Sequence, residues 1–203
     1  IAYVSPDFRE HPLSYLLVGL FESQDRSKFE IIGLTLSRPD ASAMAQRVGA
    51  AFERFIDVSA MSDGEVAALM RELEIDIAVD LTGYTQNNRT AIFAARPAPI
   101  QVNYLGFPAT MGADYMDYII ADEFVIPEAF RPQYAEQIAY LPECYQGNDD
   151  LRAIAERTPS RAEVGLPETS FVFCAFNNTY KLTPIFFDVW MRLLLGAPGS
   201  VLW

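Results

Sequence analysis

Short apolar runs alternate along the chain with segments whose apolar residues recur at helical spacing. The first such segment carries Leu13, Leu16, Leu17, Leu20 and Phe21. These positions follow the i, i+3, i+4, i+7 pattern of a single helix face. A second stripe runs from Val66 to Leu73. It follows Ser62-Asp63-Gly64-Glu65, which has the form of a capping box and predicts the start of a helix.

The apolar runs between the stripes are short enough to be strands. They are Ile1–Val4, Phe29–Leu36, Arg54–Val58, Ile75–Leu81, Ile100–Leu105, Tyr118–Ala121, Gln137–Leu141 and Phe171–Phe176. Alternation of helices with near-continuously apolar strands is typical of a parallel, doubly wound α/β sheet. We therefore predict that fold class.

The pattern changes near Glu143, where the chain becomes polar. We expect an N-terminal lobe over residues 1–142, a linker over 143–170 and the start of a second α/β unit over 171–203. Within the linker, Thr158 and Pro159 predict the start of a short helix that Gly165 ends. No initiator methionine is present and the last residues resemble a strand, so we expect a fragment of a longer protein.

The charge balance limits the partners. The chain has 15 Lys and Arg residues against 27 Asp and Glu residues, a net charge of −12. Nucleic acid and anionic membrane surfaces normally require a basic surplus, so we expect neither as a partner. Small phosphorylated ligands stay possible because a helix N-terminus can bind them. A single histidine excludes a zinc site built on several His ligands.

Nothing indicates secretion or membrane insertion. No apolar run reaches the ~18–20 residues of a membrane span, and no signal peptide is present. The two cysteines form no CxxC site or disulfide framework. We expect a cytoplasmic protein.

Four polar segments follow predicted strands, where open α/β sheets bind ligands. They are Ser5–Pro12, Asp80–Arg89, Leu105–Gly112 and Phe176–Pro184. His11 could serve as a base or orient a hydroxyl, or could be an idle loop residue. Lys181, with the following helix N-terminus, could hold a pyrophosphate, or could be a solvated lysine. The GxGxxG, P-loop and GxSxG motifs are absent.

In this order, the motifs resemble one family. The motifs are Tyr3–Pro12, Gly83–Thr85, Arg96–Val102, Leu105–Pro108, Met116–Ile120, Phe176–Lys181 and Pro198–Trp203. Over essentially its whole length the chain resembles the catalytic region of the O-linked N-acetylglucosamine transferase / SPINDLY family, in a bacterial form.

The resemblance implies a GT-B glycosyltransferase with two Rossmann-like lobes. The family inverts the sugar anomer, uses no metal, and moves N-acetylglucosamine from UDP-N-acetylglucosamine to Ser and Thr hydroxyls of proteins. Tetratricopeptide repeats usually precede this region, so we expect them upstream in the full protein. The second lobe would be truncated here, and we expect the isolated fragment to be inactive.

The resemblance also implies roles for particular residues. His11 matches the active-site histidine, Lys181 the lysine that holds the pyrophosphate, and Asp57 an aspartate suggested to relay the acceptor's proton. The positions that line the donor are Asn178, Tyr180, Leu105, Gly106, Phe107 and Pro108. Ala109 and Phe107 depart from the family's usual Gly-Tyr-Pro-Gly-Thr, which puts the sugar contacts of that loop in doubt.

Two alternatives stay open. A SPINDLY-like protein would transfer fucose from GDP-fucose with the same fold. A non-catalytic α/β binding module would recognise nucleotides or proteins and would tolerate replacement of His11 and Lys181.

Overall fold

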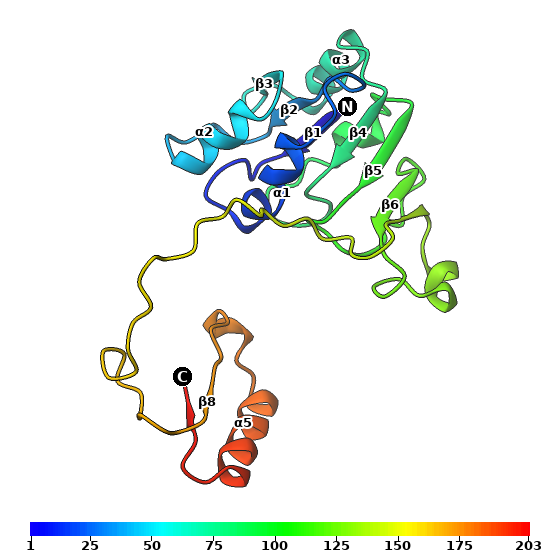
Figure 1. Ribbon diagram of the computed structural model, residues 1–203. Coiled ribbons are helices and arrows are strands. Elements are labelled where there is room, and N and C mark those ends of the chain that lie inside the picture. The colour runs from blue at the N-terminus through cyan, green and yellow to red at the C-terminus, as the bar shows by residue number, and fades with distance from the viewer. The chain divides into compact units, whose positions relative to one another are not determined.

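The computed structural model describes residues 1–203, which form two compact units, Ile1–Arg152 and Ala153–Trp203. The first unit is built on a seven-stranded sheet in the order β3-β2-β1-β4-β5-β6-β7 (Figure 1). The strands are β1 (Ala2–Ser5), β2 (Ile32–Thr35), β3 (Arg54–Asp57), β4 (Ile77–Asp80), β5 (Ile100–Asn103), β6 (Tyr118–Ala121) and β7 (Gln137–Tyr140). Every pairing in this sheet is parallel. The predicted α/β class is confirmed, and the first six strands have the Rossmann order.

Helices cover both faces of the sheet. They are α1 (Pro12–Glu22), α2 (Ala43–Ala50), α3 (Asp63–Glu72) and α4 (Ala91–Ala94), with a 3₁₀ helix, η1 (Glu128–Gln133), between β6 and β7. Leu17 of α1 and Val48 of α2 pack in one core cluster with Tyr3, whereas Met70 of α3 packs in the other with Val4. Because neighbouring residues of β1 point to opposite faces, the two clusters lie on opposite sides of the sheet.

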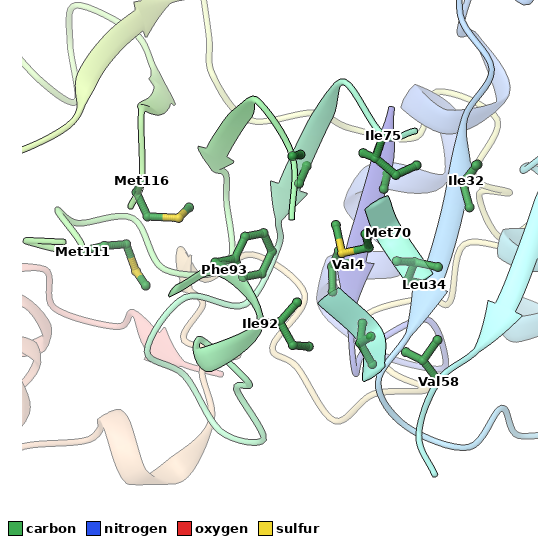
Figure 2. Packing of buried hydrophobic residues seen from close by; sticks show 14 of the residues in the cluster. Val4, Ile32, Leu34, Val58, Met70, Ile75, Ile92, Phe93, Met111 and Met116 are labelled. Carbon is green, nitrogen blue, oxygen red and sulfur yellow. The ribbon is translucent and has the colours of Figure 1, made fainter. Parts of the chain in front are cut away.

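The cluster under α3 and α4 is formed almost entirely by apolar side chains. Figure 2 shows Met70, Ile92 and Phe93 gathered around Val4 and Leu34 of the central strands. All five are almost completely buried. The predicted capping box at the start of α3 is confirmed, since Ser62 and Glu65 exchange side-chain-to-backbone hydrogen bonds.

The first part of the expected linker belongs to the first unit. The Tyr104 hydroxyl donates to the Tyr145 carbonyl (2.7 Å), and the Tyr145 N–H donates to Asp122 (2.8 Å). Farther along, Arg47 of α2 pairs with the buried carboxylate of Asp149 (2.6 Å). These contacts fix residues 143–152 to the sheet and to α2.

The second unit is a single βαβ element. Its parallel strands are β8 (Val172–Phe173) and β9 (Val201–Leu202), joined through η2 (Thr179–Lys181) and α5 (Pro184–Gly196). Thr183 caps α5 as predicted, with its hydroxyl accepting from the Phe186 N–H. Strand β8 is much shorter than the expected run Phe171–Phe176.

The prediction of a helix from Thr158 to Gly165 is wrong. Ser160, not Thr158, makes reciprocal hydrogen bonds with Glu163, and the chain forms only a turn that ends at Gly165 with a φ of +72°. The segment from Pro159 to Gly165 is too short to form a stable helix, because the first helical turn is costly to nucleate and needs following turns to stabilise it.

Candidate functional site

A cavity of about 320 Å³ opens at the carboxyl ends of β1, β4 and β5. Its lining residues are Asp7, Arg9, His11, Pro12, Leu13, Leu16, Leu81, Thr85, Gln86, Asn87, Leu105 and Gly106. Strand order reverses between β1 and β4, which is where open α/β sheets leave a crevice for ligands. The structure therefore brings together three of the four strand-end segments that the sequence singled out.

The turn between β1 and α1 is held by buried hydroxyls. Ser5 Oγ accepts from the Asp7 N–H (3.0 Å), and Ser14 Oγ donates to the Asp7 carbonyl (2.6 Å). The Arg9 N–H donates to the same carbonyl (2.8 Å), while the Phe8 side chain lies in the core. These contacts leave the side chains of Asp7, Arg9 and His11 at the cavity.

Asp7 lies between a guanidinium and an imidazole. Its Oδ1 accepts from Arg9 Nη2 at 3.1 Å, and its Oδ2 lies 3.8 Å from His11 Nδ1. Arg9 Nε is buried and has no hydrogen-bond partner. His11 is also the N-cap of α1, where its Nδ1 accepts from the Leu13 N–H at 3.2 Å.

The turn after β5 is sterically tight. The Gly106 N–H donates to the Tyr104 carbonyl (2.8 Å) around Leu105, whose φ is +66°. This is a γ-turn with a positive central φ, which is rare and strained for a branched side chain. A Cβ on Gly106 would lie 1.9 Å from the Leu81 carbonyl oxygen, so only glycine fits.

Phe107 and Pro108 of the same loop are not among the lining residues. Phe107 instead covers Gly83, where a Cβ would come within 2.3 Å of it, and its ring lies edge-on to Tyr84 with 5.5 Å between the centroids. Phe107 therefore joins the loop after β5 to the loop after β4.

Asp80 of β4 and Asn103 of β5 are paired in the sheet, and their side chains hold the loops that follow these two strands. Asp80, 3% exposed, accepts from the Thr82 N–H (2.8 Å) and the Gly83 N–H (3.1 Å) through Oδ1. Asn103, its partner on β5, donates from Nδ2 to the carbonyls of Phe107 (3.1 Å) and Ala109 (3.0 Å). Burial raises the pKa of the Asp80 carboxyl above its ordinary value, although the backbone hydrogen bonds oppose this shift.

The other expected site residues lie elsewhere. Asp57 ends the edge strand β3, is exposed, and is not among the lining residues. Hydrogen bonds from the Ser59 hydroxyl and backbone N–H hold the pKa of Asp57 below its ordinary value. Asn178, Tyr180 and Lys181 belong to the second unit, where they form the exposed η2 turn before α5.

Sequence reasoning assigned no role to several residues that the structure places at the site. In the sequence, Asp7 and Arg9 are only neighbours of His11, and Gln86 and Asn87 are only members of a polar loop. Asp80 begins that loop, and the sequence alone does not show its buried contacts. Position at a strand end was the available signal, but it does not tell which side chains face a cavity.

Within residues 1–203, no group of three or more His, Cys, Asp or Glu side chains is placed to hold a metal ion. No helix is both long and apolar enough to cross a membrane.

The model of glycosyl transferase family 41 matches residues 1–158 and 152–203 of this chain. The chain belongs to glycosyl transferase family 41. Among its family 41 relatives is the probable UDP-N-acetylglucosamine–peptide N-acetylglucosaminyltransferase SEC of Arabidopsis thaliana, 41% identical over 208 residues. The UDP-N-acetylglucosamine–peptide N-acetylglucosaminyltransferase of Caenorhabditis elegans is 34% identical over 186 residues.

A solved structure is similar to this chain over almost its whole length. A mutant O-GlcNAc transferase from Thermobaculum terrenum matches with a TM-score of 0.85 and 31% sequence identity, over 99% of this chain and 37% of that one. The GT-B fold class expected from the sequence is thereby confirmed. The match to the Arabidopsis protein includes the whole of this chain and 21% of the Arabidopsis protein's length. The match to the worm protein includes 91% of this chain and 16% of the worm protein's length.

Proposed function

We propose that this chain is part of an inverting, metal-independent glycosyltransferase that moves N-acetylglucosamine from UDP-N-acetylglucosamine to Ser and Thr hydroxyls of proteins. The observation that carries the proposal is the cavity at the β1–β4 switch point in a family 41 chain. His11 and the Leu105-Gly106 turn line it together, as the resemblance to transferases of this kind requires. The names of the Arabidopsis and worm relatives supply the donor and the peptide acceptor.

The chemistry is a single displacement at the anomeric carbon. The acceptor oxygen forms a bond to that carbon on one face while the bond to the diphosphate oxygen breaks on the other, which inverts the anomer. The acceptor's proton passes to a base, either Asp57 through a relay or an oxygen of the donor phosphate, and negative charge develops on the leaving nucleoside diphosphate. Stabilising that charge is the largest task for the protein.

The second unit carries groups suited to this task. Lys181 supplies a full positive charge, and α5 begins three residues later with the partial positive charge of a helix N-terminus. We assign Lys181 to the diphosphate and place Asn178 and Tyr180 beside the donor. Replacing Lys181 by Ala in the complete enzyme is expected to remove nearly all turnover, and near-normal turnover would contradict the assignment.

The first unit carries a cavity of its own. The cavity combines apolar walls with a few polar groups, which is typical of small-molecule sites and suits a pyranose ring with its acetamido group. Asp57 lies outside the lining, so any part it takes in removing the acceptor's proton requires a relay. We place the protein in the cytoplasm and tetratricopeptide repeats upstream, and both are proposals.

Donor binding and transfer test the function directly. Calorimetry of the gene-complete protein against UDP, UDP-N-acetylglucosamine, GDP and GDP-fucose should show selective binding of the uridine compounds. Labelled N-acetylglucosamine should then pass to Ser or Thr in a mixed peptide pool without added metal and in the presence of a chelator. Selective binding of GDP-fucose would indicate a fucosyltransferase on the same fold, and a folded protein that binds neither donor would be a non-catalytic module.

A further inference from the structure

We propose that Glu136 is a positioning residue for transfer, because its buried carboxylate holds the Thr110-Met111 segment and thereby keeps the Leu105-Gly106 turn in the wall of the cavity. The part that this wall plays toward the sugar rests on the proposed function. Glu136 stands directly before β7, two strands away from β5 in the sheet, and is 4% exposed. It is not among the residues that line the cavity, so it acts only through the loop that it holds.

Both oxygens of the Glu136 carboxylate are used by the loop after β5. Oε1 accepts from the Met111 N–H at 2.5 Å, and Oε2 accepts from the Thr110 hydroxyl at 2.6 Å. None of the ion pairs of the chain includes Glu136. A buried carboxylate is costly unless hydrogen bonds compensate its charge, and hydrogen bonds to a charged acceptor are the strong ones. The carboxylate is therefore committed to this loop.

Thr110 extends the contact to the backbone around it. Its hydroxyl oxygen, whose hydrogen is donated to Glu136, accepts from the Gly112 N–H (3.0 Å) and the Ala135 N–H (3.3 Å). One side chain thus joins the end of the loop after β5 to the start of β7.

The Met111 peptide is held from two sides. Glu136 accepts from its N–H, and the Tyr84 hydroxyl donates to its carbonyl at 3.0 Å. The Met111 side chain lies in the core cluster under α3 and α4 (Figure 2). The far end of the loop after β5 is therefore fixed to β7, to the loop after β4 and to the core.

The turn at Leu105 depends on such anchors. A branched residue at positive φ is strained, and strain of this kind persists only where the surrounding contacts over-determine the backbone. Close packing of Gly106 decides whether the turn can form, Asn103 holds two carbonyls in the middle of the loop, and Glu136 holds its far end. Release of the far end lets Leu105 return to a negative φ and withdraws the turn from the cavity.

Glu136→Gln tests this role, because the side chain keeps its size but cannot accept from both donors. Its one carbonyl oxygen can accept from the Met111 N–H, and its amide group then faces Thr110 Oγ1, which already accepts from two N–H groups. In the gene-complete enzyme we expect kcat/KM for UDP-N-acetylglucosamine to fall about tenfold or more.

Affinity for UDP separates positioning from general damage. UDP lacks the sugar that the wall serves, so calorimetry should give the same Kd for UDP in E136Q and in the unsubstituted enzyme. Loss of folded protein would reduce the amounts of transfer and of bound UDP together. An unchanged kcat/KM in E136Q would overturn the proposal, and so would a fall that is matched by the loss of UDP binding.

Glu53→Gln is the matched control. Glu53 stands directly before the opposite edge strand β3, where its Oε2 accepts from the Ile31 N–H (2.8 Å) and from Arg26 (2.6 Å), and it is not among the lining residues. E53Q should lower the free energy of unfolding and leave kcat/KM and the Kd of UDP unchanged. A fall in kcat/KM as large as in E136Q would show that any weakened sheet edge has this effect.

Thr110 provides a second route if E136Q does not fold. Thr110→Val removes the hydroxyl that donates to Glu136 and should reproduce the fall in kcat/KM, and Thr110→Ser should recover most of it. The E136Q/T110V double variant should lose little more than either single variant, because both remove the same hydrogen bond. Equal losses in T110V and T110S would contradict a role for this bond.

The proposal and the proposed function fail separately. Amide hydrogen exchange over residues 105–112 measures the hold of Glu136 on the loop without any donor, and it should be faster in E136Q than in the unsubstituted protein or E53Q. Unchanged exchange in E136Q would overturn the proposal even if transfer occurs. Absence of transfer from UDP-N-acetylglucosamine by the unsubstituted enzyme would refute the function, whatever the exchange shows.

Discussion

The turn after β1 and the turn after β5 line the same cavity but are held by different physical means. The turn after β1 is fixed by hydrogen bonds, with the hydroxyls of Ser5 and Ser14 and the cap formed by His11 satisfying its backbone. The turn after β5 is fixed by close packing, with Leu105 at a positive φ and Gly106 against the Leu81 carbonyl. One wall of the cavity should therefore respond to changes in polar groups and the other to changes in side-chain volume.

The largest effect is expected in the turn after β5, which is held by close packing. Gly106→Ala places a Cβ 1.9 Å from the backbone oxygen of Leu81, which has no flexible end that can move aside. We expect the free energy of unfolding to fall by about 3 kcal/mol or more, measured by urea denaturation. Gly64→Ala is the matched control, because its Cβ would meet nothing within 4 Å and the change should be neutral or slightly stabilising. Equal losses in both variants would show that steric fit does not hold the β5 turn.

The next largest effect is expected at Asp80, which is paired with Asn103 in the sheet and holds the loop after β4. Asp80→Ala would leave the N–H groups of Thr82 and Gly83 without an acceptor, at a cost of about 2 kcal/mol. Asp80→Asn keeps the accepting Oδ1 and should cost clearly less. Urea denaturation of both variants at one pH measures the difference, and a loss in Asp80→Asn as large as in Asp80→Ala would contradict an acceptor role.

Asp80 also predicts a pH dependence. Its ordinary pKa is 3.8, and burial raises the pKa in the folded chain. The folded state therefore retains the proton above pH 3.8, where the unfolded state has lost it, so this contribution to stability is present at low pH and is lost as the pH rises through the raised pKa. The stability of the unsubstituted chain relative to Asp80→Asn should decline over that window. An increase would mean that the backbone hydrogen bonds outweigh burial.

Most of the architecture could be predicted because it depends on the local pattern of apolar and polar residues. The stripe on α1, the capping box of α3 and the apolar strands each carry their signal within a few residues of sequence. The expected helix after Pro159 failed for the same kind of local reason, since a cap and a stop signal were present but the turns between them were too few.

The site was only partly predictable, because it depends on contacts between distant segments. The sequence located His11 and the Leu105-Gly106 turn, whereas the contact of Gly106 with Leu81 exists only once β4 and β5 are paired. The pairing of Asp80 with Asn103 in the sheet has the same origin. No local signal distinguishes such a buried carboxyl from an ordinary polar residue at a strand end.

The smallest effect is expected at the cap, and it tests the hydrogen-bonded wall most selectively. His11→Ala removes the acceptor of the Leu13 N–H and should lower the free energy of unfolding by about 1 kcal/mol. His11→Asn should restore nearly all of that stability, because the Asn carbonyl accepts at the same place in the turn. Thermal denaturation of the two variants side by side provides the measurement. If they are equally destabilised, then Nδ1 does not cap α1, the Leu13 N–H has another acceptor, and the turn after β1 is held by packing of Phe8 in the same manner as its counterpart after β5.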